Sequence, residues 1–332
     1  MIKTDNKIED LFNYLNESAT LLEKEGSYTY LEALAEVGEN LFQQDVVQPV
    51  PEDVKGQLSQ QIDKIKIEEY EPEWIRKSFQ LAVLKGMKEV TQSHHAMTPD
   101  AVCLFMSYLV NKVTSNKKEG FSLIDLAAGS GNLLSALLNQ SPSPIKGYGF
   151  EVDETLLHIA FVHANLQKNE VELFHKDSIQ PIEFPEVDVI VTDLPVGFYP
   201  NDEIAKSFSL RSTEGHSFIH HLMIEKGIER TKAGGFLFFI VPNFLFESDQ
   251  APVLHAYLKE HTCIHGLLQL PKTMFKSKQQ AKSILMLQKK GKDVRQPQQA
   301  LLAELPSFSN KPALGDMVQQ INKWFKEELG LL

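Results

Sequence analysis

The sequence has few cysteines, no long apolar run and no surplus of positive charge, and each shortage argues against a class of protein. Two cysteines, Cys103 and Cys263, occur among 332 residues, and they form no C-x-x-C pair. Disulfide scaffolds and cysteine-based zinc sites need more cysteines than this, so the pattern is typical of a reducing cytoplasm. No signal peptide and no bilayer-spanning segment is recognisable, which predicts a cytoplasmic protein without a membrane partner.

The shortage of positive charge bears on nucleic acid as a partner. The formal net charge is -11, and phosphate contacts supply most of the affinity of nucleic-acid-binding proteins, so the balance disfavours DNA. Residues 271–295 are the exception. They either form a phosphate-contacting edge or are solvated loops that protect an edge strand from aggregation. Against the single acid Asp293, this stretch carries Lys272, Lys276, Lys278, Lys282, Lys289, Lys290, Lys292 and Arg295.

Apolar spacing divides the chain into three predicted parts. Residues 1–90 show helical periodicity and no strand signal, as in the stripe at i, i+3, i+4 and i+7 that begins at Ile8. They predict a helical N-terminal domain that covers the rest of the protein or binds a protein partner. Residues 91–295 predict a second domain, and residues 296–332 predict a C-terminal extension that ends in a helix.

From Phe121 onward, short apolar runs alternate with helical runs. This alternation predicts an α/β fold with a doubly wound, mostly parallel, Rossmann-like sheet that helices cover on both faces. The last two runs are joined by a polar, lysine-rich connection without helical period, which predicts a final antiparallel strand. The seven predicted strands are 122–126, 145–150, 171–175, 187–192, 236–241, 264–270 and 283–288.

A loop with two glycines follows the first predicted strand. It reads Asp125-Leu-Ala-Ala-Gly-Ser-Gly-Asn132, at the carboxyl end of the strand, where doubly wound sheets bind ligands. Gly129 and Gly131 let the backbone turn sharply and approach a ligand closely. Glu151 ends the second strand, where a carboxylate can accept hydrogen bonds from ribose hydroxyls. The loop therefore predicts a site for a cofactor that contains a nucleoside.

Two details favour S-adenosylmethionine over NAD in this loop. Leu134 replaces the third glycine of G-x-G-x-x-G, and the Asp125 carboxylate would repel a pyrophosphate. S-adenosylmethionine carries an ammonium and a sulfonium instead, which the same carboxylate would attract. Asp177, after the third strand, is placed to accept from the adenine amino group. The predicted cofactor-binding residues are Asp125, Ala127, Gly129, Gly131, Asn132, Glu151, Val152, Asp177 and Ser178.

The fourth strand ends in Asp193-Leu194-Pro195-Val196. Asp followed by Pro is a common strand stop, and this is the simpler interpretation. Beside the other strand ends, the Asp193 carboxylate and the Leu194 carbonyl can instead converge on one donor group. A planar amino group needs two such acceptors to be held in line with a methyl sulfonium.

Together these segments resemble the DNA methyltransferases that methylate adenine N6, and they are most similar to the modification subunit of type I restriction systems. The resemblance implies a seven-stranded sheet whose last strand is antiparallel, S-adenosylmethionine as cofactor, and Asp193–Val196 as the catalytic motif. It adds Met97 and Thr98 to the cofactor site, because Met97-Thr98-Pro99 resembles a family motif that closes over the methionine end of the cofactor. The matching segments are 97–99, 125–134, 149–151, 164–166, 193–196, 234–242 and 270–275.

The sequence also departs from this family. Leu194 and Val196 stand where the family has proline and an aromatic ring that stacks on the flipped-out base, a contact worth ~1–3 kcal/mol. Phe198 and Tyr199 are close by but at another offset. No target-recognition domain is recognisable. A cofactor-binding module without base chemistry, which acts on a protein partner, therefore remains an alternative, as does a nicotinamide-dependent oxidoreductase.

The histidines give no metal signal. His216, His220 and His221 have helical spacing but lack the acidic partner of an H-E-x-x-H motif, so we expect core or cleft-lining positions and no metal. His94 and His95 precede Thr98 and line either the cofactor entrance or an ordinary loop.

Overall fold

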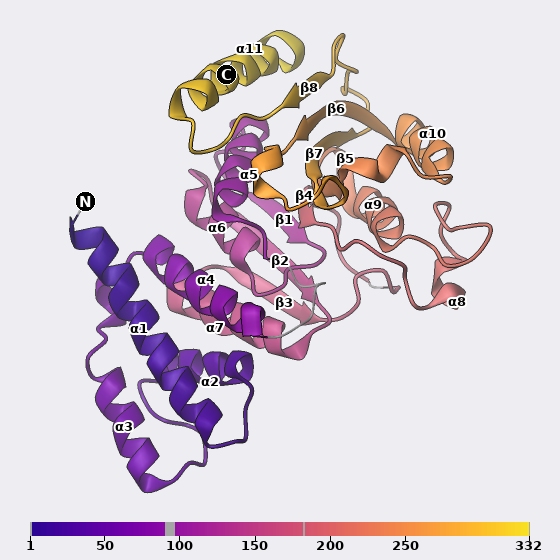
Figure 1. The fold of residues 1–332 in the computed structure, drawn as a ribbon. Coiled ribbons are helices and arrows are strands. Elements are labelled where there is room, and N and C mark those ends of the chain that lie inside the picture. The colour runs from indigo at the N-terminus through magenta and orange to yellow at the C-terminus, as the bar shows by residue number, and fades with distance from the viewer. Residues whose placement is uncertain (1, 90–96, 182, 332) are drawn as a thin grey trace. The chain divides into compact units, whose positions relative to one another are not determined.

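The fold described here is a computed structural model, which describes residues 2–89, 97–181 and 183–331. His94, His95 and the predicted domain boundary at residue 90 lie outside these residues. Within the described part, eight strands form one sheet in the order β3-β2-β1-β4-β5-β7-β6-β8 (Figure 1). The strands are β1 (Phe121–Asp125), β2 (Ile145–Glu151), β3 (Val171–His175), β4 (Val187–Asp193), β5 (Thr231–Pro242), β6 (Thr262–Gln269), β7 (Lys282–Lys289) and β8 (Leu301–Glu304).

The predicted α/β class, with a mostly parallel sheet and N-terminal helices, is confirmed. Strand β7 is antiparallel to both β5 and β6, as its polar connection predicted. The sheet has one strand more than the predicted seven, because β8 pairs in parallel with β6. This edge strand has only four residues, and Leu302 is 72% exposed, so it carries little of the apolar pattern that marks a buried strand.

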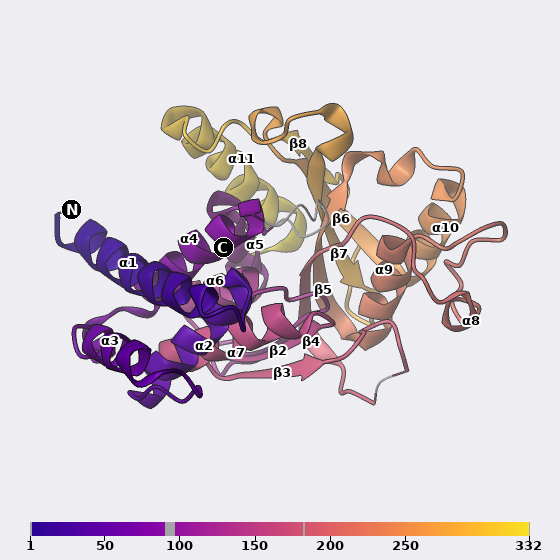
Figure 2. The same ribbon diagram turned by 60° about the horizontal axis from the view of Figure 1, so that its bottom comes forward.

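Helices precede, connect and follow the strands (Figures 1 and 2). Two N-terminal helices begin at common start signals: Thr29 and Glu32 form a capping box before α2, and α4 begins at Pro72. The helices are α1 (Ile2–Lys24), α2 (Tyr30–Gln43), α3 (Glu52–Ile62), α4 (Pro72–Glu89), α5 (Asp100–Val113), α6 (Asn132–Gln140), α7 (Glu154–Gln167), α8 (Asp202–Ala205), α9 (Ile219–Arg230), α10 (Ala251–His261) and α11 (Lys311–Leu329).

The chain forms two compact units, each built from several segments. The first comprises Met1–Pro99, Ala128–Gln140 and Gly149–His175, and the second comprises Asp100–Ala127, Ser141–Tyr148 and Lys176–Leu332. The glycine loop therefore contributes residues to both units, and each unit is described by itself.

The first unit packs the N-terminal helices onto α6 and α7. Helices α1, α2 and α4 contact one another, α2 and α4 contact α7, and α4 also contacts α6. At Gly38 the backbone of α2 comes so close to α7 that an added Cβ would lie 2.8 Å from Val162. The apolar stripes of the N-terminal helices and of α7 thus share one hydrophobic core, which includes Phe79 and Ile159.

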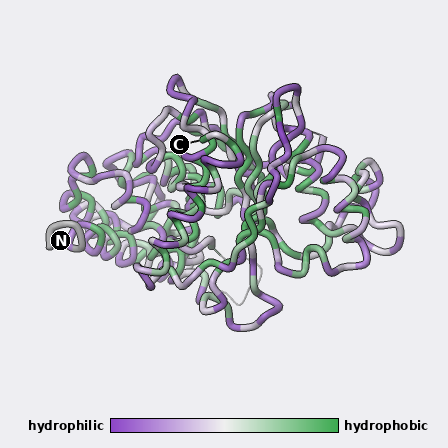
Figure 3. Tube along the Cα trace, turned by 90° about the horizontal axis from the view of Figure 1, so that it is seen from above, coloured by the Kyte–Doolittle hydropathy of each residue, from purple (hydrophilic) through white to green (hydrophobic). Residues whose placement is uncertain are grey.

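The second unit is centred on strands β4, β5 and β7. Phe238, Phe239, Ile284 and Leu285 are fully buried, and hydrophobic residues concentrate along the sheet while the loops are polar (Figure 3). At the start of β4, Asp188 accepts bonds from Lys117, Lys232 and Ser122. Burial raises the pKa of Asp188, but these donors outweigh it and hold the pKa well below its usual range.

Three buried histidines give the fold a predicted sensitivity to acid. Burial, and then the Arg76 charge, lowers the pKa of His163 to about 3; burial lowers the pKa of His220 to about 3 and of His221 to about 4. Below pH 6.5 the unfolded chain binds protons at these rings and the folded chain does not, so stability falls as pH falls. Each ring should cost about 1.4 kcal/mol between pH 7.5 and 5.5. Burial also lowers the pKa of His265, which adds to this loss. Urea unfolding at both pH values measures the total, and His163→Gln should remove the contribution of one ring, about 1.4 kcal/mol.

Candidate functional site

In the first unit, Gly129 and Gly131 of the loop differ in what surrounds them. Both have positive φ, +55° at Gly129 and +79° at Gly131. A Cβ on Gly131 would lie 3.1 Å from the Cβ of Ala160, so this glycine is needed where the loop packs on α7. A Cβ on Gly129 would meet no atom within 4 Å. The backbone at Gly129 therefore leaves room for a ligand to approach.

Glu151 holds the loop to the end of β2. One carboxylate oxygen accepts the Gly129 N–H at 2.7 Å, and the other accepts the Val152 and Asp153 N–H groups, both at 2.9 Å. Glu151 is only 8% exposed, so these charge-assisted bonds fix its orientation. A carboxylate oxygen can accept more than one bond, so Glu151 can still receive hydroxyl donors.

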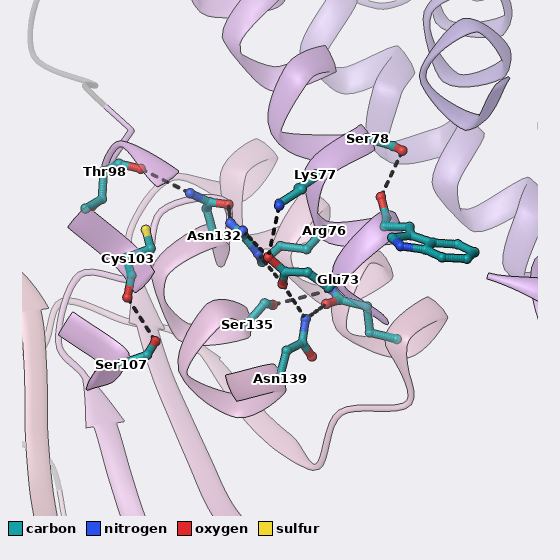
Figure 4. A network of polar contacts seen from close by, with 12 residues as sticks. Glu73, Arg76, Lys77, Ser78, Thr98, Cys103, Ser107, Asn132, Ser135 and Asn139 are labelled. Carbon is teal, nitrogen blue, oxygen red and sulfur yellow. Dashed lines mark hydrogen bonds and ion pairs between the residues drawn. The ribbon is translucent and has the colours of Figure 1, made fainter. Parts of the chain in front are cut away.

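Sequence reasoning missed a buried arginine that supports the start of α6. Arg76 is fully buried; its Nε and one terminal nitrogen donate to the two oxygens of Glu73 at 2.8 and 2.6 Å. The other terminal nitrogen donates to Oδ1 of Asn132 at 2.8 Å, and Asn132 donates to the Thr98 carbonyl at 3.1 Å (Figure 4). Two predicted cofactor residues, Thr98 and Asn132, are thus joined by a hydrogen bond, and Arg76, which is paired with Glu73, orients the Asn132 side chain.

Met97 and Val152 complete the predicted cofactor residues of the first unit. Met97 is half-buried and packs against the helical core, whereas Val152 is 61% exposed. An apolar side chain exposed directly after Glu151 can cover one face of a planar ring. The Val152 carbonyl lies 2.9 Å from Nε2 of His175, which ties the end of β2 to the end of β3.

In the second unit, Asp125 ends β1 next to β4. It is 1% exposed, and its Oδ1 accepts the Ala127 N–H at 3.1 Å. The Leu126 N–H donates to Oγ1 of Thr192 at 3.0 Å, which holds the first turn of the loop against β4. Since β1 and β4 pair in parallel, Asp125 and Asp193 leave the sheet at the same edge.

Asp177 is held by its own turn and by a tyrosine. Its Oδ1 accepts the Ile179 N–H at 2.9 Å, and its Oδ2 accepts the Tyr199 hydroxyl at 2.5 Å. Burial, and then this carboxylate, raises the pKa of Tyr199, so the phenol stays protonated and donates. Tyr199 is buried and therefore cannot replace the aromatic ring that is missing from the predicted motif at Asp193–Val196. Ser178, next to Asp177, is also buried.

Asp193 forms an ion pair that the sequence did not predict. Lys282, at the start of β7, donates to Oδ1 of Asp193 at 2.6 Å. The Lys282 side chain is 24% exposed and the Asp193 side chain 16%. Leu194 is fully buried, and its N–H donates to the Ile240 carbonyl at 3.1 Å. This bond extends the pairing of β4 with β5 by one residue beyond Asp193.

The remaining motif residues reach the surface. Pro195 is half-buried and Val196 is 42% exposed. Phe198 is 61% exposed and stacks on Phe218, with ring centroids 5.0 Å apart. Phe198 is thus the aromatic ring near the motif that a ligand can reach, two residues beyond the position that the resemblance implies.

The histidine cluster lies in the core and at the surface of the second unit. His220 and His221 are buried edge-to-face, and His216 is exposed and lies 2.9 Å from a carboxylate oxygen of Asp202. Among the residues that the structure describes, no group of three His, Cys, Asp or Glu side chains is arranged to hold a metal. In the same residues, no helix is long and apolar enough to cross a membrane.

The sheet order, with its antiparallel β7, and the loop at the end of β1 define a class I S-adenosylmethionine-dependent methyltransferase. The sequence model described as N-6 DNA Methylase matches residues 86–328, and that described as YtxK N-terminal helical domain matches residues 9–87. The chain therefore belongs to the N-6 DNA methylase family, and the predicted resemblance is confirmed. Membership implies S-adenosylmethionine as the methyl donor.

Relatives resemble the chain over its whole length. The uncharacterized protein YtxK of Bacillus subtilis (strain 168) is 50% identical over 321 residues, which cover 96% of this chain and 97% of that protein. A crystal structure from Listeria monocytogenes, assigned to the class I S-adenosylmethionine-dependent methyltransferases, is 40% identical with a TM-score of 0.91, and the match covers 97% of this chain and 100% of the other. The type I restriction-modification methyltransferase subunit of Streptococcus thermophilus shares the fold at 15% identity and a TM-score of 0.68, over 95% of this chain and 74% of its own.

Proposed function

We propose that this protein transfers a methyl group from S-adenosylmethionine to an exocyclic amine, and that adenine N6 in DNA is the first acceptor to test. The observation that carries the proposal is the position of Asp193 at the end of β4, in the motif where the family holds its target amine, one strand from the glycine loop at the end of β1. Family membership supports the donor and the reaction type.

The residues of each unit suit a sulfonium nucleoside. In the first unit, Gly129 leaves open space, Glu151 offers acceptors for hydroxyls, and Val152 offers an apolar surface. In the second, Asp125 and Asp177 provide carboxylates that suit an ammonium and an amino group. When bound, S-adenosylmethionine supplies an electrophilic methyl group.

In this proposal Asp193 and the Leu194 carbonyl accept hydrogen bonds from the acceptor amine. They hold the nitrogen in line with the sulfonium methyl group and stabilise the positive charge that develops on nitrogen. On transfer, the C–S bond would break as the N–C bond forms, S-adenosylhomocysteine would leave, and the proton lost from the nitrogen would pass to water. A base in duplex DNA would have to leave the stack to reach these groups. Purified protein, methyl-labelled S-adenosylmethionine and unmethylated DNA provide the test, with N6-methyladenine detected by nucleoside mass spectrometry; no label in any nucleoside would reject DNA as the acceptor.

Two observations favour a second candidate function. Lys282 occupies an oxygen of Asp193, and Val196 supplies no ring for base stacking. A protein that binds S-adenosylmethionine without base chemistry, and acts through its N-terminal helices on a protein partner, would have these features. Tight cofactor binding without turnover on DNA or RNA would support it.

Cofactor binding should depend on Glu151. Glu151→Ala removes the acceptor of three backbone N–H groups, including that of Gly129, and any ribose contact, so the Kd for S-adenosylmethionine should rise about 10- to 100-fold. Isothermal titration calorimetry measures this. Glu154→Ala, an exposed acid in the first turn of α7, is the matched control and should bind as wild type. Equal affinities of Glu151→Ala and wild type would place the cofactor elsewhere.

A further inference from the structure

The pairing of Lys282 with Asp193 conflicts with the simplest form of the proposed reaction. An amine acceptor needs the lone pairs of Asp193, yet Lys282 Nζ already donates to Oδ1 at 2.6 Å. The pair carries no net charge, so it stabilises a positive charge developing on nitrogen less than the carboxylate alone would. The acceptor must therefore either share Asp193 with Lys282 or draw the lysine away.

The position of Lys282 is fixed by the sheet and not by a loose loop. Lys282 pairs with Pro242 of β5, and its carbonyl accepts the Leu270 N–H at 3.0 Å. The next residue, Ser283, donates to Oδ1 of Asn243 at 2.7 Å. The backbone of Lys282 is therefore fixed, and only its flexible side chain can move away from Asp193. The ammonium group has three N–H donors, and the bond to Asp193 Oδ1 uses one of them.

Two further exposed lysines lie near Lys282 in the sequence. The connection between β6 and β7 lies at the sheet edge where β4 and β5 end, and it places the exposed Lys276 and Lys278 within six residues of Lys282. Among the described residues neither Lys276 nor Lys278 forms an ion pair, whereas Lys272 pairs with Glu304. The chain has a net charge of -11, so the lysines of this connection form a local positive region. Such a region is suited to an anionic partner.

We propose that Lys282 is a specificity-determining residue that exchanges Asp193 for a backbone phosphate of a nucleic-acid acceptor. Phosphate binding to Lys282, assisted by Lys276 and Lys278, releases Oδ1 of Asp193 for the target amine. An amine without a neighbouring phosphate leaves the ion pair closed and is a poor acceptor. This inference rests on the proposed function for its catalytic consequence, but the phosphate contact can be measured without turnover.

The test is equilibrium binding of fluorescent DNA and RNA oligonucleotides between 50 and 200 mM salt, with wild type, Lys282→Met, Lys282→Arg and Asp193→Asn. Lys282→Met should weaken binding about fivefold and reduce the slope of log K against log salt by about one, since one phosphate contact is lost. Asp193→Asn should tighten binding severalfold because Lys282 no longer has a competing carboxylate, and Lys282→Met should abolish that gain. Lys282→Arg should keep the wild-type slope.

The matched control is Lys232→Met. Lys232 pairs with Asp188 at 2.9 Å at the opposite end of β4 and β5, so its loss should leave the salt slope unchanged. A wild-type slope for Lys282→Met, a gain from Asp193→Asn that persists in the double variant, or no salt-dependent binding of either nucleic acid would each overturn the inference. Absence of methyl transfer with the expected binding pattern would instead reject the proposed reaction. With turnover, Lys282→Met should raise KM for the oligonucleotide more than it lowers kcat.

Discussion

Asp193→Ala should reduce methyl transfer roughly 100- to 1,000-fold, the usual consequence of removing one group that stabilises transition-state charge. Of the two substrates, the carboxylate is proposed to contact the acceptor amine and not the methyl donor, so the affinity for S-adenosylmethionine should change little. Initial rates with labelled cofactor, together with calorimetry of cofactor binding, separate these two effects. Asp193→Asn keeps one acceptor oxygen, so its activity should fall between those of wild type and alanine.

The control for this prediction is Asp202→Ala. Asp202 lies nine residues further on, and it is exposed and paired with the exposed His216, so its loss should leave methyl transfer near wild type. Equal rates for Asp193→Ala and wild type would show that another group binds the acceptor. A lost cofactor affinity would show that Asp193 acts on the donor side instead.

Much of the fold could be predicted because buried parallel strands leave a strong local pattern. The apolar runs around β1, β4 and β5 and the polar connection before β7 gave the sheet and its antiparallel strand. Helix α5 was not predicted, although its buried residues Val102, Met106, Leu109 and Val113 follow a helical period. The short edge strand β8 left too few residues for a period of two to show.

Residues of the candidate site could be predicted only where a polar side chain stands at the end of a predicted strand. Asp125, Glu151 and Asp193 come directly from strand positions, and the structure describes each of them at the end of its strand. Pairings between distant segments leave no local signal. Lys282 lies 89 residues from Asp193, and it stood out in the sequence only as one of eight basic residues in residues 271–295.

Arg76 also pairs with a distant segment, and among such residues its loss should destabilise the protein most. Its guanidinium donates to Glu73 and to Asn132 from a fully buried position, and Asn132 opens α6 directly after the glycine loop. Arg76→Met would fill similar volume but leave the Glu73 carboxylate with only its longer contacts to Lys77 at 3.8 Å and Asn139 at 3.4 Å. Because Glu73 is 21% exposed, breaking this partly buried pair should cost about 2 kcal/mol, less than a fully buried pair. The free energy of unfolding from urea titration should fall by that amount.

Cofactor affinity should fall as well, because Asn132 would lose one of the two bonds that hold it between Arg76 and the Thr98 carbonyl. Lys77→Met is the neighbouring control: Lys77 lies 3.8 Å from the same Glu73 and is 35% exposed, so its loss should cost less than about 1 kcal/mol. Arg76→Lys keeps the charge but cannot donate in a planar fork to Glu73 and also reach Asn132, so it should recover only part of the stability. Unfolding curves for Arg76→Met that match those of Lys77→Met would mean that the buried fork contributes no net stability, and that its function is to position Asn132.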